Sequence, residues 1–204
     1  MIELGLWSAV LIGVLLVHEL GHVIAARWVG FPVRTISVGF GPKLFGITDR
    51  HGALWALRLF PFGASCDVHG MSVNQAAGNH PFSRNQLYKE VLIYSAGPLF
   101  NIALAAAAFV AEAIFCGGVD LSRLNPYLAG WPEVILVIAG LSLSVGVFNL
   151  LPALPLDGGR ILVLGIDLLR GRRTSVRIEQ GASIVGLALL LALSVSLLIY
   201  AVML

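Results

Sequence analysis

Residues 6–26, LWSAVLIGVLLVHELGHVIAA, form an apolar run in which Glu19 is the only acidic residue. A helix of this length can cross a bilayer. His18 and His22 lie four residues apart, so both imidazoles face one side of a helix and can bind one zinc ion, while Glu19 stays free to act as a general base. Ionisable groups are costly at this depth, which makes a chance match a poor explanation. The stretch therefore predicts a membrane-spanning helix that carries part of a metal site.

The composition agrees with a membrane protein. The chain has 204 residues, of which 58% are hydrophobic and 12% are charged, and a soluble domain carries about twice that share of charge. The first run is too long for a signal peptide and contains the motif itself, so we expect it to be retained. Three further apolar segments follow. The predicted fold is an all-α polytopic membrane protein, a single domain over residues 1–204 with four transmembrane helices at about 6–26, 91–115, 134–156 and 182–204.

The distribution of cations predicts the orientation. Of the 13 lysines and arginines, all except Arg123 fall on one side if the four helices alternate in direction. Because cytoplasmic loops carry the excess of positive charge, we expect both termini to lie outside and the histidines to lie near the cytoplasmic face. The expected location is the inner membrane of a prokaryotic cell. The net charge of +2 is explained by topology and lipid contacts, so no nucleic-acid partner is expected.

A zinc site needs a third protein ligand at the same depth as the two histidines. Asp157 ends the third apolar segment, which also runs from outside to inside, and it is the expected ligand. Depth alone leaves three loop histidines as alternatives: His51, His69 and His80. The two cysteines, Cys66 and Cys116, form no CxxC pair, so a thiolate zinc site is not expected.

The residues before Asp157 predict a broken helix. Residues 149–160 read NLLPALPLDGGR. Each proline removes a backbone donor and clashes with the preceding turn, whereas the glycines permit tight backbone geometry. Irregular backbone at membrane depth occurs where it is buried in protein or lines a wet cavity. We therefore expect this segment to lie beside the metal site.

Residues 34–68 contain short β-favouring runs separated by Gly-Pro, Asp-Arg-His-Gly and Pro-Phe-Gly turn signals. They predict a small, membrane-associated β-hairpin or sheet on the cytoplasmic side, with Trp55, Leu57 and Phe60 at the interface. A sheet edge beside the site could bind an extended peptide by strand addition. A plain amphipathic linker is the alternative.

Taken together, HELGH at 18–22 and NLLPALPLDGG at 149–159 resemble the site-2 protease family of intramembrane zinc metalloproteases. SAGPLFN at 95–101 is similar to the family's G-P-x-x-N segment, and VGFGPK at 38–43 resembles its β-hairpin region. The resemblance implies one zinc ion per chain. It also implies that His18, His22 and Asp157 are the metal ligands, that Glu19 is the catalytic acid/base, and that Asn149 and Asn101 bind substrate.

By this resemblance the chain would hydrolyse peptide bonds within or near transmembrane segments, with a single-span membrane protein as substrate and the lipid bilayer as its environment. Residues 117–132 are too few for the PDZ domain of many relatives, and no nucleotide-sensing domain follows residue 204, so a minimal catalytic core is expected. One alternative is a zinc peptidase that trims peptides at the cytoplasmic interface. Another is a zinc carrier or a metal-sensing membrane protein, although a carrier needs ligands along the whole route across the membrane. Whether the chain forms a homo-oligomer is left open.

Overall fold

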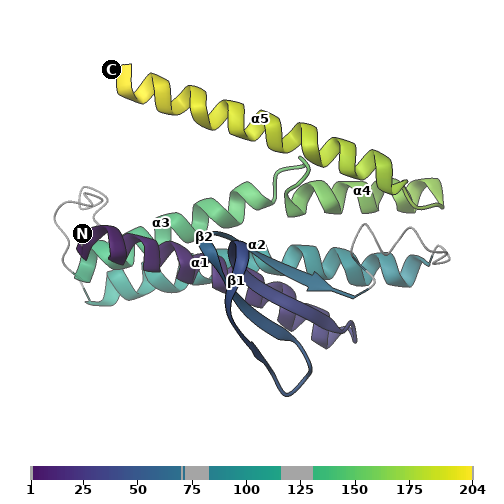
Figure 1. Ribbon diagram of the computed structural model, residues 1–204, viewed down its shortest axis with the longest axis horizontal. Helices are drawn as coiled ribbons and strands as arrows, with labels where there is room; N and C mark the ends of the chain where they lie inside the picture. Colours follow the sequence, from purple (N-terminus) through teal and green to yellow (C-terminus); the bar gives the residue numbers. More distant parts are fainter. Residues whose placement is uncertain (1, 70, 72–82, 116–130, 204) are drawn as a thin grey trace.

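The computed structural model describes residues 2–69, 71, 83–115 and 131–203. Five helices and two strands occur in this part of the chain, in the order α1, β1, β2, α2, α3, α4, α5 (Figure 1). The helices are α1 (Ile2–Trp28), α2 (Arg84–Phe115), α3 (Trp131–Asn149), α4 (Asp157–Arg170) and α5 (Val176–Met203). The mostly helical fold with a small sheet is therefore confirmed.

Among the described residues, three helical stretches are long and apolar enough to cross a membrane: 5–28, 84–115 and 176–196. The apolar part of α3, Val134–Asn149, is shorter. Helix α3 stops at Asn149 and a loop follows, so the helical part of the third apolar segment ends where the broken stretch was expected to begin. Asp157 does not close this helix; it begins the separate helix α4.

The loop between α3 and α4 folds back on itself. Its amides find partners close by in the chain: the backbone N–H of Ala153 donates to Leu151 O at 2.8 Å, and that of Leu156 donates to Ala153 O at 2.9 Å. Gly159 lies so close to this loop that an added Cβ would be 2.6 Å from the oxygen of Ala153. The prolines thus interrupt the helix, and the glycine allows the loop to pack onto the first turn of α4.

Small residues bring α1, α2 and α3 together. A Cβ on Gly21 of α1 would be 2.6 Å from the backbone oxygen of Ala96 in α2. A Cβ on Gly146 of α3 would be 2.9 Å from the backbone oxygen of Pro98. Glycine lets membrane helices approach this closely, since no side chain separates their backbones. Both close approaches lie in the middle of the three-helix group, beside the HELGH motif.

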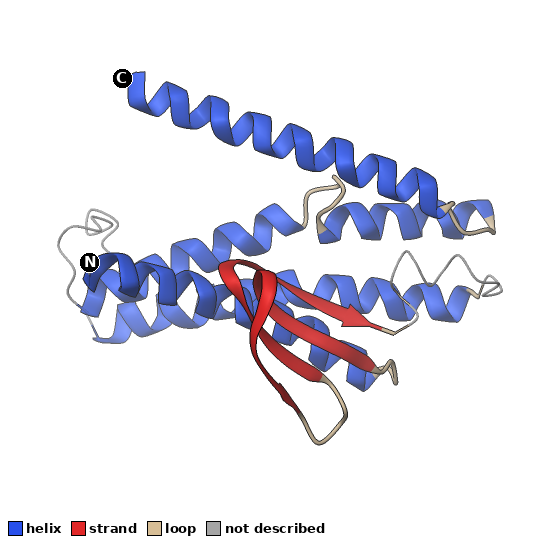
Figure 2. Cartoon of the chain, viewed as in Figure 1, coloured by secondary structure: helices blue, strands red, loops and turns tan. Residues whose placement is uncertain are grey.

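The sheet consists of β1 (Val33–Thr48) and β2 (Leu54–Val68), which pair antiparallel. Both strands bend, β1 at two glycines with positive φ, Gly39 and Gly41. Residues 35–38 of β1 pair with both halves of β2, at 54–57 and at 64–67. Figure 2 shows the resulting folded sheet beside the helices. The outer arms are therefore 43–48 of β1 and 64–68 of β2.

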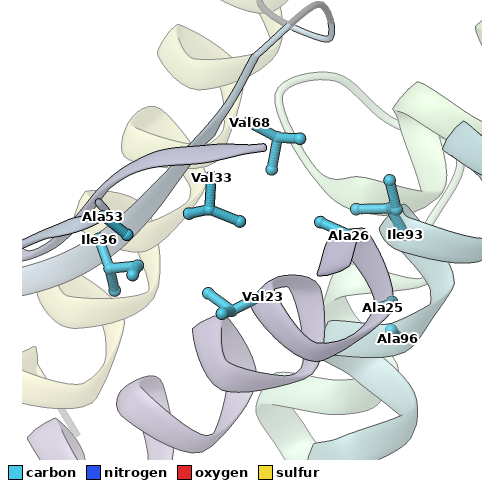
Figure 3. Close-up of a cluster of buried hydrophobic side chains, with 9 residues drawn as sticks. All are labelled: Val23, Ala25, Ala26, Val33, Ile36, Ala53, Val68, Ile93 and Ala96. Carbon is cyan, nitrogen blue, oxygen red and sulfur yellow. The ribbon is translucent and has the colours of Figure 1, made fainter. Parts of the chain in front are cut away.

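A buried apolar cluster fixes the sheet to the helices (Figure 3). Val23 at the end of α1 points towards the sheet residues Val33 and Ile36, and Ile93 of α2 lies on the other side of α1. The remaining members of the apolar cluster are Ala25, Ala26, Ala53, Val68 and Ala96. Burying such side chains contributes about 25 cal/mol per Å² of apolar surface. The cluster thereby holds the 64–68 arm beside the end of α1 that carries the histidines.

Helix α5 lies apart from the others over most of its length (Figure 1). No residue in the apolar stretch that makes α5 a candidate membrane span is buried inside the protein. It is joined to α4 by an ion pair between Arg160 and Glu179, with Nη1 and Oε2 2.6 Å apart. Gly186 also lies in very close contact with the backbone of Leu154 in the α3–α4 loop. The first half of α5 is thus held against the loop that precedes Asp157.

Candidate metal centre

Two helices place three potential metal ligands around one point. His18 and His22 lie one turn apart on α1, and Asp157 is the first residue of α4. Asp157 Oδ2 is 3.0 Å from His18 Nε2 and 3.4 Å from His22 Nε2, and the two Nε2 atoms are 3.2 Å apart. All three side chains are largely withdrawn from solvent. In the described part of the chain, this is the group of His, Cys, Asp and Glu side chains arranged to hold a metal ion.

These contacts fit a cation better than they fit each other. His22 Nδ1 is 2.8 Å from the carbonyl oxygen of Ile93, so in a neutral ring this nitrogen carries the proton. Its Nε2 is then an electron-pair donor that faces the carboxylate of Asp157, and two such atoms repel unless a cation lies between them. Tetrahedral zinc with bonds of about 2.0–2.1 Å separates neighbouring ligand atoms by about 3.3 Å. The observed spacing matches that value.

Glu19 is not part of the ligand group. Its side chain is 8% exposed and lines the cavity that also contains the two histidines. Because it follows His18 directly in α1, it reaches the same cavity from a different angle. A carboxylate in this place can take up and deliver a proton beside the metal.

The cavity has a volume of about 460 Å³. One wall is the outer arm of β2, Ala64–Val68, and another is made by residues from α2 and from the α3–α4 region, including Tyr94, Asn149, Pro155 and Arg160. A pocket of this size is typical for a small ligand or a few residues of an extended peptide. The sheet and the broken segment predicted from the sequence thus meet at the same cavity.

The two asparagines differ in position. Asn149 lines the cavity, and its Nδ2 donates to the backbone oxygen of Val145 at 2.9 Å. Asn101 is fully buried, and its Nδ2 lies 3.3 Å from His18 Nδ1, behind the metal ligand. It is not among the residues that line the cavity. The sequence motif that contains Asn101 did not indicate this contact, because the contact depends on how α2 packs against α1.

The loop histidines lie elsewhere or outside the described residues. His51 lies in the turn between β1 and β2, where its backbone N–H donates to Asp49 Oδ1 at 2.8 Å. His69 directly follows β2 and is not in the ligand group. His80 lies outside the described residues.

Sequence reasoning missed two ion pairs, one of which involves a residue of the cavity wall. Arg160 lines the cavity and pairs with Glu179 of α5. Arg173, in the α4–α5 turn, donates two hydrogen bonds to buried Glu90 of α2, at 2.7 and 2.5 Å. The carboxylate of Glu90 raises the pKa of Arg173 above its usual value. No short-range pattern signals such pairs, since their partners are 19 and 83 residues apart.

Two further groups outside the membrane helices, Asp49 and Cys66, have shifted pKa values. Hydrogen bonds from Trp55 and from Arg27, at the end of α1, hold the pKa of Asp49 well below its usual range. This contact ties the turn between β1 and β2 to α1. Burial raises the pKa of Cys66 to about 12, and the nearby charge of Glu19 adds to the effect. Cys66 lines the cavity as a neutral thiol, which is a poor metal ligand.

A buried His-His-Asp centre with an adjacent glutamate, set in helices apolar enough for a bilayer, defines the class of membrane metalloproteins with hydrolase-like sites. Comparison with known families narrows this class. The model of peptidase family M50 matches residues 6–120 and 117–193, so the chain belongs to peptidase family M50. The predicted relation to the site-2 proteases, zinc metalloproteases of the membrane, is thereby confirmed, and zinc is the metal that the site fits.

Similar proteins agree with this family. A Brucella suis protein named "Putative zinc metalloprotease" is 35% identical over 134 residues, which are 59% of this chain and 35% of that protein. A Chlamydia pneumoniae protein with the same description is 33% identical over 156 residues, which are 66% of this chain and 23% of that protein. The chain thus spans about a third or less of the length of these relatives.

A solved structure supports the fold. The site-2 protease from Methanocaldococcus jannaschii superposes with a TM-score of 0.54 at 22% sequence identity, covering 96% of this chain and 68% of that chain. At this identity the likeness supports the shared fold. It places nearly the whole described chain within one known architecture.

Proposed function

We propose that this chain is an intramembrane zinc metalloprotease that hydrolyses peptide bonds within or near transmembrane segments of membrane proteins. The observation that carries the proposal is the convergence of His18, His22 and Asp157 beside Glu19, in a cavity between apolar helices and a sheet arm. Family M50 membership supports the same chemistry.

The residues of the site have different roles, metal binding and proton transfer. His18, His22 and Asp157 would hold zinc, which when bound supplies Lewis acidity that acidifies a water and polarises the scissile carbonyl. Glu19 takes the proton of the attacking water and passes it to the leaving nitrogen. The partial burial of the cavity strengthens these electrostatic interactions, because little bulk water screens them.

We further propose four membrane spans, with α3 and the loop after it as the third. In this arrangement both chain ends lie outside the cytoplasm, in the inner membrane of a prokaryotic cell, and the metal centre lies near the cytoplasmic face. The cation pattern supports this orientation, since α1 ends at Arg27 and Trp28, α4 ends at Arg170, and the α4–α5 turn contains Arg172 and Arg173. Figure 1 agrees, with the start of α1 and the end of α5 at the same end of the molecule.

The outer arm of β2 offers a way to hold the substrate. Ala64–Val68 lines the cavity, and its inner side pairs with β1, which leaves its outer side free of strand partners within the described sheet. An unwound substrate segment can pair with such an edge by main-chain hydrogen bonds. Substrate helices must unwind near the metal, because an intact helix keeps its carbonyls in internal hydrogen bonds.

The deciding experiment uses the purified, zinc-loaded protein in lipid vesicles with a single-span membrane protein, followed by mass mapping of the products. We expect a cut within or at the edge of the span. Glu19→Gln should retain about one zinc per chain and lose cleavage, whereas Asp157→Ala should lose both. Cuts restricted to soluble peptides would favour the interface peptidase instead, and equal zinc loss in both variants would refute the assigned roles.

The proposed strand pairing at the outer arm of β2 can be tested by modifying the backbone of the substrate. A peptide with N-methylated amides at the residues next to the cut cannot form strand pairs there and should be cleaved much more slowly. The control carries the same modification far from the cut. Equal cleavage of the two peptides would show that the arm is only a wall of the cavity.

A further inference from the structure

One side of helix α2 contacts both histidines. Ile93, Gly97 and Asn101 are spaced four residues apart, so they lie along the same side of the helix. The carbonyl oxygen of Ile93 accepts from His22 Nδ1, and Asn101 contacts His18 Nδ1. Gly97 lies between them, where an added Cβ would be 2.9 Å from His18 Nε2. Ile93 and Asn101 thus contact the two rings at Nδ1, whereas Gly97 lies close to their Nε2 atoms.

The contact at His18 has a definite chemical requirement. His18 faces Asp157 and His22 through Nε2, so Nε2 is the nitrogen that can bind a metal. In a neutral imidazole the proton then sits on Nδ1, which needs a hydrogen-bond acceptor in this buried place. Asn101 is the group that the structure places at Nδ1, 3.3 Å away.

The asparagine can meet this requirement. Its side chain is 0% exposed, and its Oδ1 has no hydrogen-bond partner among the described residues, whereas Nδ2 is the atom nearest His18. The two ends of a carboxamide have the same shape, and a half-turn exchanges them. After that half-turn, the orphaned oxygen accepts the Nδ1–H of His18. A carboxamide can thus serve either tautomer, donating to Nδ1 in one and accepting from it in the other.

We propose that Asn101 is a positioning residue: its carboxamide oxygen accepts the Nδ1–H of His18 and so holds Nε2 free and directed at the metal. The role of Asn101 is therefore not contact with substrate, from which its burial behind the histidine separates it. This inference rests on the proposed zinc site. It adds a side-chain partner for His18 that matches the backbone partner of His22.

The test measures zinc affinity of the whole purified protein by competition with a chelator. Asn101→Leu keeps the volume and removes the acceptor, and its zinc affinity should fall about 10–100-fold, as is typical when a partner of a metal-binding histidine is lost. Asn101→Asp keeps an acceptor oxygen and should bind zinc within a few-fold of the original protein. Ser95→Ala is the matched control on the same helix, because within the described part of the chain its hydroxyl donates to Val91 O, and its loss should leave zinc affinity unchanged.

A second measurement needs no variant. Long-range ¹⁵N–¹H NMR of the zinc-loaded protein should show a proton on His18 Nδ1 and none on Nε2. An unprotonated Nδ1, or equal zinc affinity in Asn101→Leu, would overturn the proposal even if another variant failed to fold. Absence of zinc binding by the original protein would instead refute the proposed function, so the two failures are distinguishable.

Discussion

Replacing Gly97 by alanine should disable the metal centre without touching any ligand. An added Cβ would lie 2.6 Å from His22 Cε1 and 2.9 Å from His18 Nε2, and still closer to His22 Nε2. Ordinary contacts of this kind begin at 3.4 Å, so the His22 ring must retreat by at least about 0.8 Å. Metal sites accept ligand distances only within about 0.2 Å of the ideal. The required displacement is therefore at least about four times what the site tolerates.

We expect Gly97→Ala to lower zinc affinity by at least the 10–100-fold that follows loss of a supporting group, and to lower cleavage in proportion. The matched control is Gly140→Ala in α3, where no atom of the described residues lies within 4 Å of the added Cβ. Zinc affinity is measured by chelator competition, and folding is checked by thermal unfolding of both variants. Normal zinc affinity in Gly97→Ala would show that α2 does not press against the histidines as described.

Three further predictions concern the surroundings of the site. Glu90→Gln removes the ion pair with Arg173 and should lower the free energy of unfolding by about 1–3 kcal/mol. This loss is smaller than that for a fully buried ion pair, because Arg173 is partly solvated. Unaltered thermal unfolding would contradict the prediction. In a Cys116→Ser variant at pH 8, Cys66 should react with thiol reagents on the order of a thousandfold more slowly than a free cysteine, and the rate should rise as the pH approaches 12. Rapid labelling at pH 8 would exclude the raised pKa. Reporter fusions should place Arg50 and Arg172 in the cytoplasm and the Arg123 loop on the opposite side, whereas a cytoplasmic Arg123 loop would reverse the proposed orientation.

The sequence predicted the features that depend on local spacing. The four-residue separation of His18 and His22 requires only a helix, and the structure has one from Ile2 to Trp28. Asp157 could be chosen because the direction of the helices fixes its depth, and it does lie beside the histidines. The β-favouring runs also became strands, because their turn signals are local.

Features set by long-range packing could not be predicted in the same way. The prolines and glycines of residues 149–160 all permit a break, so the sequence did not show that the helix stops at Asn149 and that another begins at Asp157. Which arm of the sheet lies at its edge depends on pairing between β1 and β2. The contact of Asn101 with His18 joins residues 83 positions apart, and only the packing of α2 on α1 creates it.

The most direct test of the metal centre is X-ray absorption spectroscopy at the zinc edge on the purified, zinc-loaded protein. We expect one zinc per chain with only nitrogen and oxygen ligands at about 2.0–2.2 Å, including the multiple-scattering signal of two imidazoles. In Asp157→Ala an oxygen ligand should be lost while the imidazole signal of any remaining zinc persists. A sulfur ligand at about 2.3 Å would point to Cys66 in the cavity wall and would contradict the assignment of His18, His22 and Asp157 as the metal site.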